Sequence, residues 1–131
     1  MLNISSVLLA FWYLTAGVQA QSPATQQADS VKSEVYFGSD MGAGESVSQE
    51  DWEQFVSDVV VPRFPAGLTV IDALGRGTRT AGGLTQSRVL IVVHSGGDDM
   101  DARLSEIKAE YKKRFGTAGV FHIDQPARIR E

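Results

Sequence analysis

The stretch PRFPAGLTV, Pro62 to Val70, decides the fold because it forces a sharp turn between two apolar segments. Pro62 disfavours helical geometry in the residue before it, so a helix arriving from the N-terminal side must end here. A second bend at Pro65 to Gly67 leads directly into a β-type run, Leu68 to Leu74. Phe64, between the two prolines, is predicted to pack into the base of the core. We interpret the stretch as a structural corner without chemistry of its own.

The segment before this corner predicts an amphipathic helix that begins at Ser48. The hydroxyl of Ser48 can cap the free backbone N–H groups, while Glu50 and Asp51 suit the positive end of the helix dipole. Apolar residues then recur at helical spacing on one face: Trp52, Phe55, Val56, Val59 and Val60. We therefore expect this helix to pack on a sheet.

The other segments complete a β-α-β-β-α-β order. Strands are predicted at Glu34 to Gly38, Leu68 to Leu74, Ser87 to Ser95 and Gly119 to Asp124, with a hairpin connection at Gly75 to Gly83 and a second helix from about Asp99 to Phe115. Two right-handed β-α-β crossovers joined by a hairpin form the ferredoxin-like arrangement. The expected fold is an α+β sandwich of two layers, with a four-stranded antiparallel sheet and both helices on one face.

The two ends of the chain differ in composition from this domain. Residues 1–20 are uncharged and largely apolar, and they end in Val18-Gln19-Ala20, which indicates a secretory signal cleaved after Ala20. An uncleaved anchor is the alternative. Residues 21–33 are predicted to be a flexible lead-in, residues 34–125 the single domain, and residues 126–131 a tail. The expected location is secreted or periplasmic.

Composition narrows the classes of partner and chemistry. A net charge of −4 argues against a nucleic-acid-binding protein, which needs a basic surface. The absence of cysteine excludes thiolate catalysis, cysteine metal sites and a lipid carried on an N-terminal cysteine. We therefore expect no cofactor, no metal, no nucleic acid and no stable membrane anchoring after signal cleavage.

Several motifs together resemble a known family. They are VYFG, then W-x-x-F-x-x-x-V-V-x-P-R-F-P-x-G-L-T-V-x-D-A-x-G, then S-R-V-L-I-V-V-H, and finally Y-K-x-R-F-G, spread between Tyr36 and Asp124. This combination resembles an uncharacterised family of small, mostly bacterial exported proteins, domain of unknown function three-five-seven-four in its numbered series. The resemblance implies export and a compact α+β domain, and it supplies no activity. Two positions depart from the family pattern: Arg76 to Arg79 stand where relatives tend to have an aromatic residue, and Thr85 where they tend to have a glutamate.

Period-two alternation assigns side chains to the two faces of the predicted sheet. We expect Val35, Phe37, Phe121 and Ile123 to face the helices, with Val89, Ile91 and Val93 sharing one face of the central strand. The open face is then expected to carry Tyr36, Arg88, Leu90, Val92, His94, His122 and Asp124.

This mixture of apolar and polar groups leaves three interpretations open. The face can be partly solvated, with ordinary surface histidines. It can pair with a second copy in a homodimer. It can also hold a ligand or catalytic pocket in which Asp124 orients His122, beside His94 and Tyr36. The sequence favours binding or self-association through the face over an enzyme. The alternative is a small cofactor-free enzyme of dimeric α+β barrel type with His94, His122 and Tyr36 in its cavity.

Overall fold

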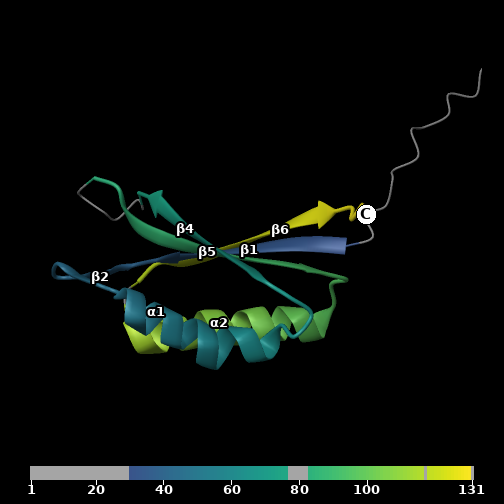
Figure 1. The fold of residues 1–131 in the computed structure, drawn as a ribbon, viewed down its shortest axis with the longest axis horizontal. Helices are drawn as coiled ribbons and strands as arrows, with labels where there is room; N and C mark the ends of the chain where they lie inside the picture. The colour runs from purple at the N-terminus through teal and green to yellow at the C-terminus, as the bar shows by residue number, and fades with distance from the viewer. Residues whose placement is uncertain (1–29, 77–82, 117, 131) are drawn as a thin grey trace, which may run out of the picture.

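The computed structural model describes residues 30–76, 83–116 and 118–130, which form two layers (Figure 1). The elements in chain order are β1 (Ser30–Gly38), β2 (Asp40–Gly42), β3 (Glu45–Ser46), α1 (Gln49–Phe55), the π-helical turn η1 (Val56–Val60), the 3-10 turn η2 (Val61–Arg63), β4 (Thr69–Gly75), β5 (Thr85–His94), α2 (Asp98–Phe115) and β6 (Val120–Ala127). The expected signal segment at 1–20, and part of the hairpin connection expected at 75–83, lie outside the described residues.

The main sheet has the strand order β4-β5-β1-β6, and each neighbouring pair is antiparallel. Both helices lie on the same side of this sheet, and its other side is uncovered in the described part of the chain (Figure 1). Because β5 and β6 both flank β1, the first strand lies in the interior of the sheet. The predicted ferredoxin-like α+β sandwich is confirmed.

The helical segment and corner follow the sequence expectation. The Ser48 hydroxyl accepts a hydrogen bond from the backbone N–H of Asp51 at 3.1 Å and so caps α1. The helix continues through η1 and η2 and ends at Arg63, one residue beyond the proline that was expected to stop it. Phe64 is 5% exposed and belongs to the core, as predicted. Gly67 then adopts a φ of 123°, which favours glycine at this bend.

Aromatic side chains form the centre of the core between the layers. Phe37 from β1 contacts Trp52, Phe55 and Tyr111 from the helical layer, with ring centroids 4.7 to 5.9 Å apart. Such pairs contribute about 0.5–1.5 kcal/mol each beyond the burial of their area. Burial raises the pKa of Tyr111 to about 12, so its neutral hydroxyl donates to the carbonyl of Gly38 at 3.0 Å. This bond ties α2 to the end of β1.

The strands differ from the sequence expectation in their bounds and in one added hairpin. β1 begins at Ser30, so residues 30–33 belong to the sheet and not to a flexible lead-in. β6 continues to Ala127 and includes Pro126, which an edge strand tolerates because half of its backbone groups face away from the sheet. The segment between β1 and α1, for which no strand was predicted, contains the short hairpin β2-β3. Among the described residues, no helix combines the length and hydropathy needed to cross a membrane.

The faces assigned to the central strand were wrong. Leu90 pairs directly with Val35, and Val92 pairs with Ser33, so these side chains share the face that the helices cover. Leu90 is 0% exposed and Val92 is 3% exposed, and both belong to the core. Arg88, on the same side of the strand, is 1% exposed. Arg88, Leu90 and Val92 therefore lie inside the sandwich, and His94 continues the same alternation toward the end of the strand.

The faces assigned to the last strand were inverted as well. His122 pairs with Val35, and Asp124 pairs with Ser33, so both point to the helix side of the sheet. Phe121 pairs with Tyr36 on the open side, where Phe121 is 57% exposed. The assignment of the first strand, with Tyr36 outward and Val35 inward, is confirmed, and Val89, Ile91 and Val93 do share one face of the central strand.

Candidate functional site

The open side of the sheet carries the candidate site, but with other residues than the sequence analysis placed there. One row of cross-strand neighbours runs through all four strands: Ile71, Val89, Tyr36 and Phe121. A second row contains Thr69, Ile91, Glu34 and Ile123. Together with Val93, Lys32 and Gln125 from the next row, we call these residues the open face. It is continuous and mostly apolar.

Large apolar side chains on the open face are exposed to solvent. Ile71 is 45% exposed, Val93 47%, Phe121 57% and Ile123 39%. The rings of Tyr36 and Phe121 stack in parallel, with centroids 4.4 Å apart and an interplanar angle of 4°. This stacking holds two large rings in place on adjacent strands, so the apolar surface is preformed.

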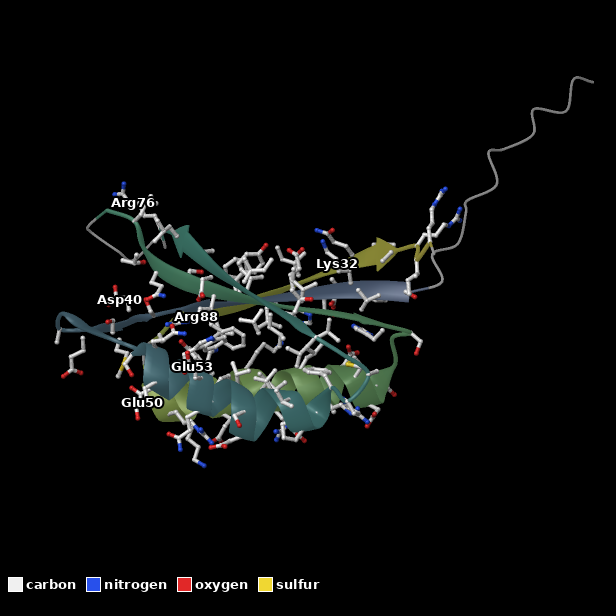
Figure 2. All side chains as sticks on the ribbon, in the orientation of Figure 1. Lys32, Asp40, Glu50, Glu53, Arg76 and Arg88 are labelled. Atoms are coloured by element: carbon white, nitrogen blue, oxygen red, sulfur yellow. The ribbon has the colours of Figure 1, made fainter. Side chains whose placement is uncertain are left out.

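The two charges on the open face neutralise each other. Lys32 Nζ lies 2.6 Å from Glu34 Oε1, and the Tyr36 hydroxyl donates to Glu34 Oε2 at 2.7 Å. The hydrogen bonds from Lys32 and Tyr36 lower the pKa of the Glu34 carboxyl, while the bond to Glu34 raises the pKa of the Tyr36 hydroxyl. Figure 2 shows Lys32 on the side of the sheet away from the helices and Arg88 between the two layers. The face thus carries no net charge.

The two histidines lie on the opposite side of the sheet, joined by Ser33 and Asp124. His94 Nε2 lies 2.7 Å from Ser33 Oγ, and the Ser33 hydroxyl donates to Asp124 Oδ1 at 2.5 Å. His122 Nε2 contacts the same Asp124 oxygen at 2.7 Å, and Lys108 Nζ lies 3.3 Å from His122 Nδ1. We call these five residues, from β1, β5, α2 and β6, the polar chain.

The partners fix the direction of each hydrogen bond in the polar chain. The backbone N–H of Gly96 donates to His94 Nδ1 at 3.0 Å, so in the neutral ring Nε2 carries the hydrogen and donates to Ser33. The Lys108 ammonium can only donate, so His122 Nδ1 accepts and Nε2–H donates to Asp124. Asp124 therefore accepts two hydrogen bonds, and both ring nitrogens of each histidine have a hydrogen-bond partner.

This direction is the reverse of what an activated serine needs. A nucleophilic serine donates its hydroxyl hydrogen to an imidazole base. Ser33 instead accepts a hydrogen bond from His94 and donates one to Asp124. Ser33 is also 0% exposed. Tyr36 lies across the sheet from both histidines, so the group of His94, His122 and Tyr36 expected for an enzyme cavity does not come together. The predicted pairing of His122 with Asp124 does form.

Sequence reasoning missed Ser33 and Lys108 in the polar chain and most of the open face. Ser33 was assigned to the lead-in, although the alternation of Ser33, Val35 and Phe37 with Lys32 and Glu34 could have extended the strand. The contact of Lys108 with His122 has no signal in the sequence, since it depends on how the helix is placed over the sheet edge. Within the described ranges, no group of three or more histidine or carboxylate side chains is arranged to hold a metal ion.

We expect Ser33→Ala to raise the pKa of Asp124 toward its ordinary value of 3.8, because hydrogen bonding from Ser33 is the largest cause that lowers it. A lowered folded-state pKa stabilises the protein above the unfolded pKa, and this contribution disappears as pH falls through the folded value. The variant should therefore lose less stability than the natural chain between pH 6 and pH 3. At pH 6 it should be about 1–2 kcal/mol less stable, since His94 loses its acceptor.

An NMR titration of the Asp124 carboxyl, with urea unfolding at both pH values, measures these changes. Ser46→Ala, at an exposed position, is the control and should match the natural chain. An Asp124 titration that Ser33→Ala leaves unchanged would show that the hydrogen bond does not control this carboxyl.

Comparison with known proteins places the chain in a family and supports the fold. Residues 32–130 match a family described as "Protein of unknown function (DUF3574)". A search of the curated proteins gave no match. Among solved structures, a phage SAM lyase in complex with S-methyl-5'-thioadenosine is similar, with a TM-score of 0.52 and 15% identity over 82% of this chain and 90% of that chain.

Two further solved structures have lower scores. The de novo designed protein Foldit4 has a TM-score of 0.48 and 16% identity, covering 76% of this chain and 99% of that one. CPII, a nitrogen regulatory PII-like protein from Thiomonas intermedia K12 bound to ADP, AMP and bicarbonate, has a TM-score of 0.43 and 14% identity, covering 78% and 97%. At these identities the likeness concerns the fold alone.

Proposed function

The chain belongs to the DUF3574 family of proteins of unknown function, and we propose that it is an exported binding domain that self-associates through its open face. The observation that carries this proposal is a continuous apolar surface on the side of the sheet that the helices leave uncovered. Monomeric proteins rarely expose apolar patches larger than a few hundred Å². A face-to-face homodimer would remove this surface from water.

The size of the whole uncovered side of the sheet, with the open face at its centre, suits a dimer interface. Four strands spaced about 4.8 Å apart, each about eight residues long at ~3.3 Å per residue, give roughly 500 Å² in plan. Side-chain relief increases the accessible area, which brings it near the ~800 Å² that each partner buries in a standard interface. Sheets packed in this way interdigitate their side chains in a layer about 10 Å thick.

The charges on the face favour a second copy as the occupant. An isologous dimer places the same patch of both copies face to face, so a net charge on that patch would be repelled by the same net charge on the partner. On the open face Lys32 and Glu34 are paired within one chain at 2.6 Å, and Tyr36 supplies a second donor to Glu34. Two identical faces can therefore approach without net electrostatic repulsion.

Export is the second part of the proposal, and it is supported by the sequence of residues 1–20. This segment is uncharged and ends in small residues at Val18 and Ala20, as signal peptides do. Cleavage after Ala20 would release the domain into the periplasm or the medium. Without cysteine, the released chain has no site for a lipid anchor of the N-terminal cysteine type.

We expect residues 21–131 to sediment at twice the monomer mass, and the double variant Ile71→Lys/Ile123→Lys to sediment as a monomer. The two positions lie on opposite edge strands of the open face, 45% and 39% exposed, so a lysine can remain solvated in the monomer. In the dimer, each new ammonium would lose its hydration. This should raise the dissociation constant of the dimer at least ~100-fold.

Val61→Lys provides the matched control. Val61 is 50% exposed, but it lies in η2 within the helical layer. This control should sediment like the unchanged chain. Analytical ultracentrifugation from about 1 to 100 µM measures both variants, and circular dichroism checks that they are folded. An unchanged chain that stays monomeric over this range would contradict self-association.

A further inference from the structure

We propose that a groove between α2 and β6 binds the phosphate group of a small molecule. The groove has a volume of about 540 Å³ and is lined by Ser105, Lys108, Ala109 and Lys112 from α2 and by Val120, Phe121 and His122 from β6. It lies at the edge of the sheet, on the helix side, and it is separate from the open face except where Phe121 borders both. The inference does not depend on dimer formation.

The helix presents its polar groups to this groove as one stripe. Ser105, Lys108, Ala109 and Lys112 are spaced i, i+3, i+4 and i+7, so they share one face of α2. Ala109 is small and leaves room between the two ammonium groups. A hydroxyl and two amines that converge on one hollow offer only hydrogen-bond donors or adaptable groups to an oxyanion.

The two lysines of the groove differ from the other cations of α2 in their partners. Arg103 pairs with Asp99 at 2.7 Å, and Lys113 and Arg114 pair with Glu110 at 3.5 and 2.9 Å. Among the described residues, neither Lys108 nor Lys112 has a carboxylate partner. Two like charges at i and i+4 repel each other, and an anion between them would remove that repulsion.

His122 adds one more donor, besides the hydroxyl and the two amines, when it is protonated. In the neutral ring, Nε2–H donates to Asp124 and Nδ1 accepts from Lys108, so the carboxylate lies on the other side of the ring from the lysine. Asp124 also accepts a hydrogen bond from the Ser33 hydroxyl, so its carboxylate is held by Ser33 and His122. A protonated His122 would keep its hydrogen bond to Asp124. Its Nδ1–H would then donate to the ligand, and Nδ1 would no longer accept from Lys108.

The charge of the site favours a phosphate over a carboxylate. Two lysines supply two positive charges, which match a phosphate dianion, whereas a carboxylate would neutralise only one. Lysine binds phosphate as a compact point charge. Ser105 can donate to a third phosphate oxygen.

Inorganic phosphate is the probe for this site, titrated into ¹⁵N-labelled residues 21–131 at constant ionic strength. We expect saturable shifts at the backbone amides of the α2 stripe and β6, with acetate at the same ionic strength binding at least about 5-fold more weakly. Lys108→Gln and Lys112→Gln should each weaken phosphate binding about 10-fold, because each removes one of two matched charges.

Lys113→Gln is the matched control, since it removes the same charge from the same last turn of α2. Lys113 pairs with Glu110 and does not line the groove, so its loss should change phosphate affinity less than 2-fold. The proposal is overturned if phosphate produces no saturable shift in the groove, or if Lys113→Gln weakens binding as much as Lys112→Gln does. Acetate binding as tight as phosphate would overturn the assignment of the ligand class.

Discussion

Replacing Leu90 by aspartate is expected to prevent folding, whereas the same replacement at Val93 should leave the fold intact. Both residues lie on β5, three positions apart, and they point to opposite faces of the sheet. Leu90 is 0% exposed in the core, where an unpaired carboxylate costs more than about 4 kcal/mol. That cost is comparable to the whole stability of a small domain, about 5–15 kcal/mol.

The aspartate at Val93 meets a different environment. Val93 is 47% exposed and pairs across the strands with Lys32, which can offset the new charge. We expect a change in unfolding free energy of less than about 1 kcal/mol in the monomer. Circular dichroism and urea unfolding of both variants measure the difference. A folded Leu90→Asp beside an unfolded Val93→Asp would restore the face assignment made from the sequence.

The order of elements could be predicted because each element has a local signal. The cap at Ser48, the apolar periodicity after it and the corner from Pro62 to Gly67 all act within a few residues of chain. Once two helices and four strands are placed in this order, the handedness of the crossovers leaves few sheet topologies. The ferredoxin-like arrangement therefore follows from local signals and a general rule.

The faces of the sheet could not be predicted in the same way. Alternation tells which residues share a face, but it does not tell which face the helices cover when both are apolar. Residues 89–93 are apolar at every position, and Phe121 and Ile123 look like core residues although they lie on the open face. The pairing of Val35 with Leu90 would have settled the question, and it is a contact between distant segments.

The position of the polar chain could not be predicted from single strands either. His122 and Asp124 were expected outside because polar side chains usually face water. They can lie on the helix side because Ser33 and Lys108 satisfy them, and those contacts join residues 91 and 14 positions apart. A polar residue can thus lie on the covered face where residues far away in the sequence form hydrogen bonds with it. The sequence of a single strand does not reveal those partners.

Arg88→Ala is expected to lower the free energy of unfolding by about 3 kcal/mol, because it empties a large space in the core. The Arg88 side chain is 1% exposed, and its guanidinium lies 5.2 Å from the centroid of the Trp52 ring. Nη2 donates to Gln49 Oε1 at 2.9 Å. The Arg88 side chain therefore supports α1 by packing against it as well as by charge.

Arg88→Met separates packing from charge at this position. Nε lies 3.5 Å from Asp72, which is 65% exposed, and Nε and Nη1 are buried without a hydrogen-bond partner in the described structure. A buried cation with so few partners gains little over an apolar side chain of similar length, since its desolvation offsets its attractions. We therefore expect Arg88→Met to stay within about 1 kcal/mol of the natural chain in urea unfolding. A loss equal to that of Arg88→Ala would instead mean that the guanidinium contacts with Gln49 and Trp52 hold α1 on the sheet, and that their strength exceeds the cost of burying the charge.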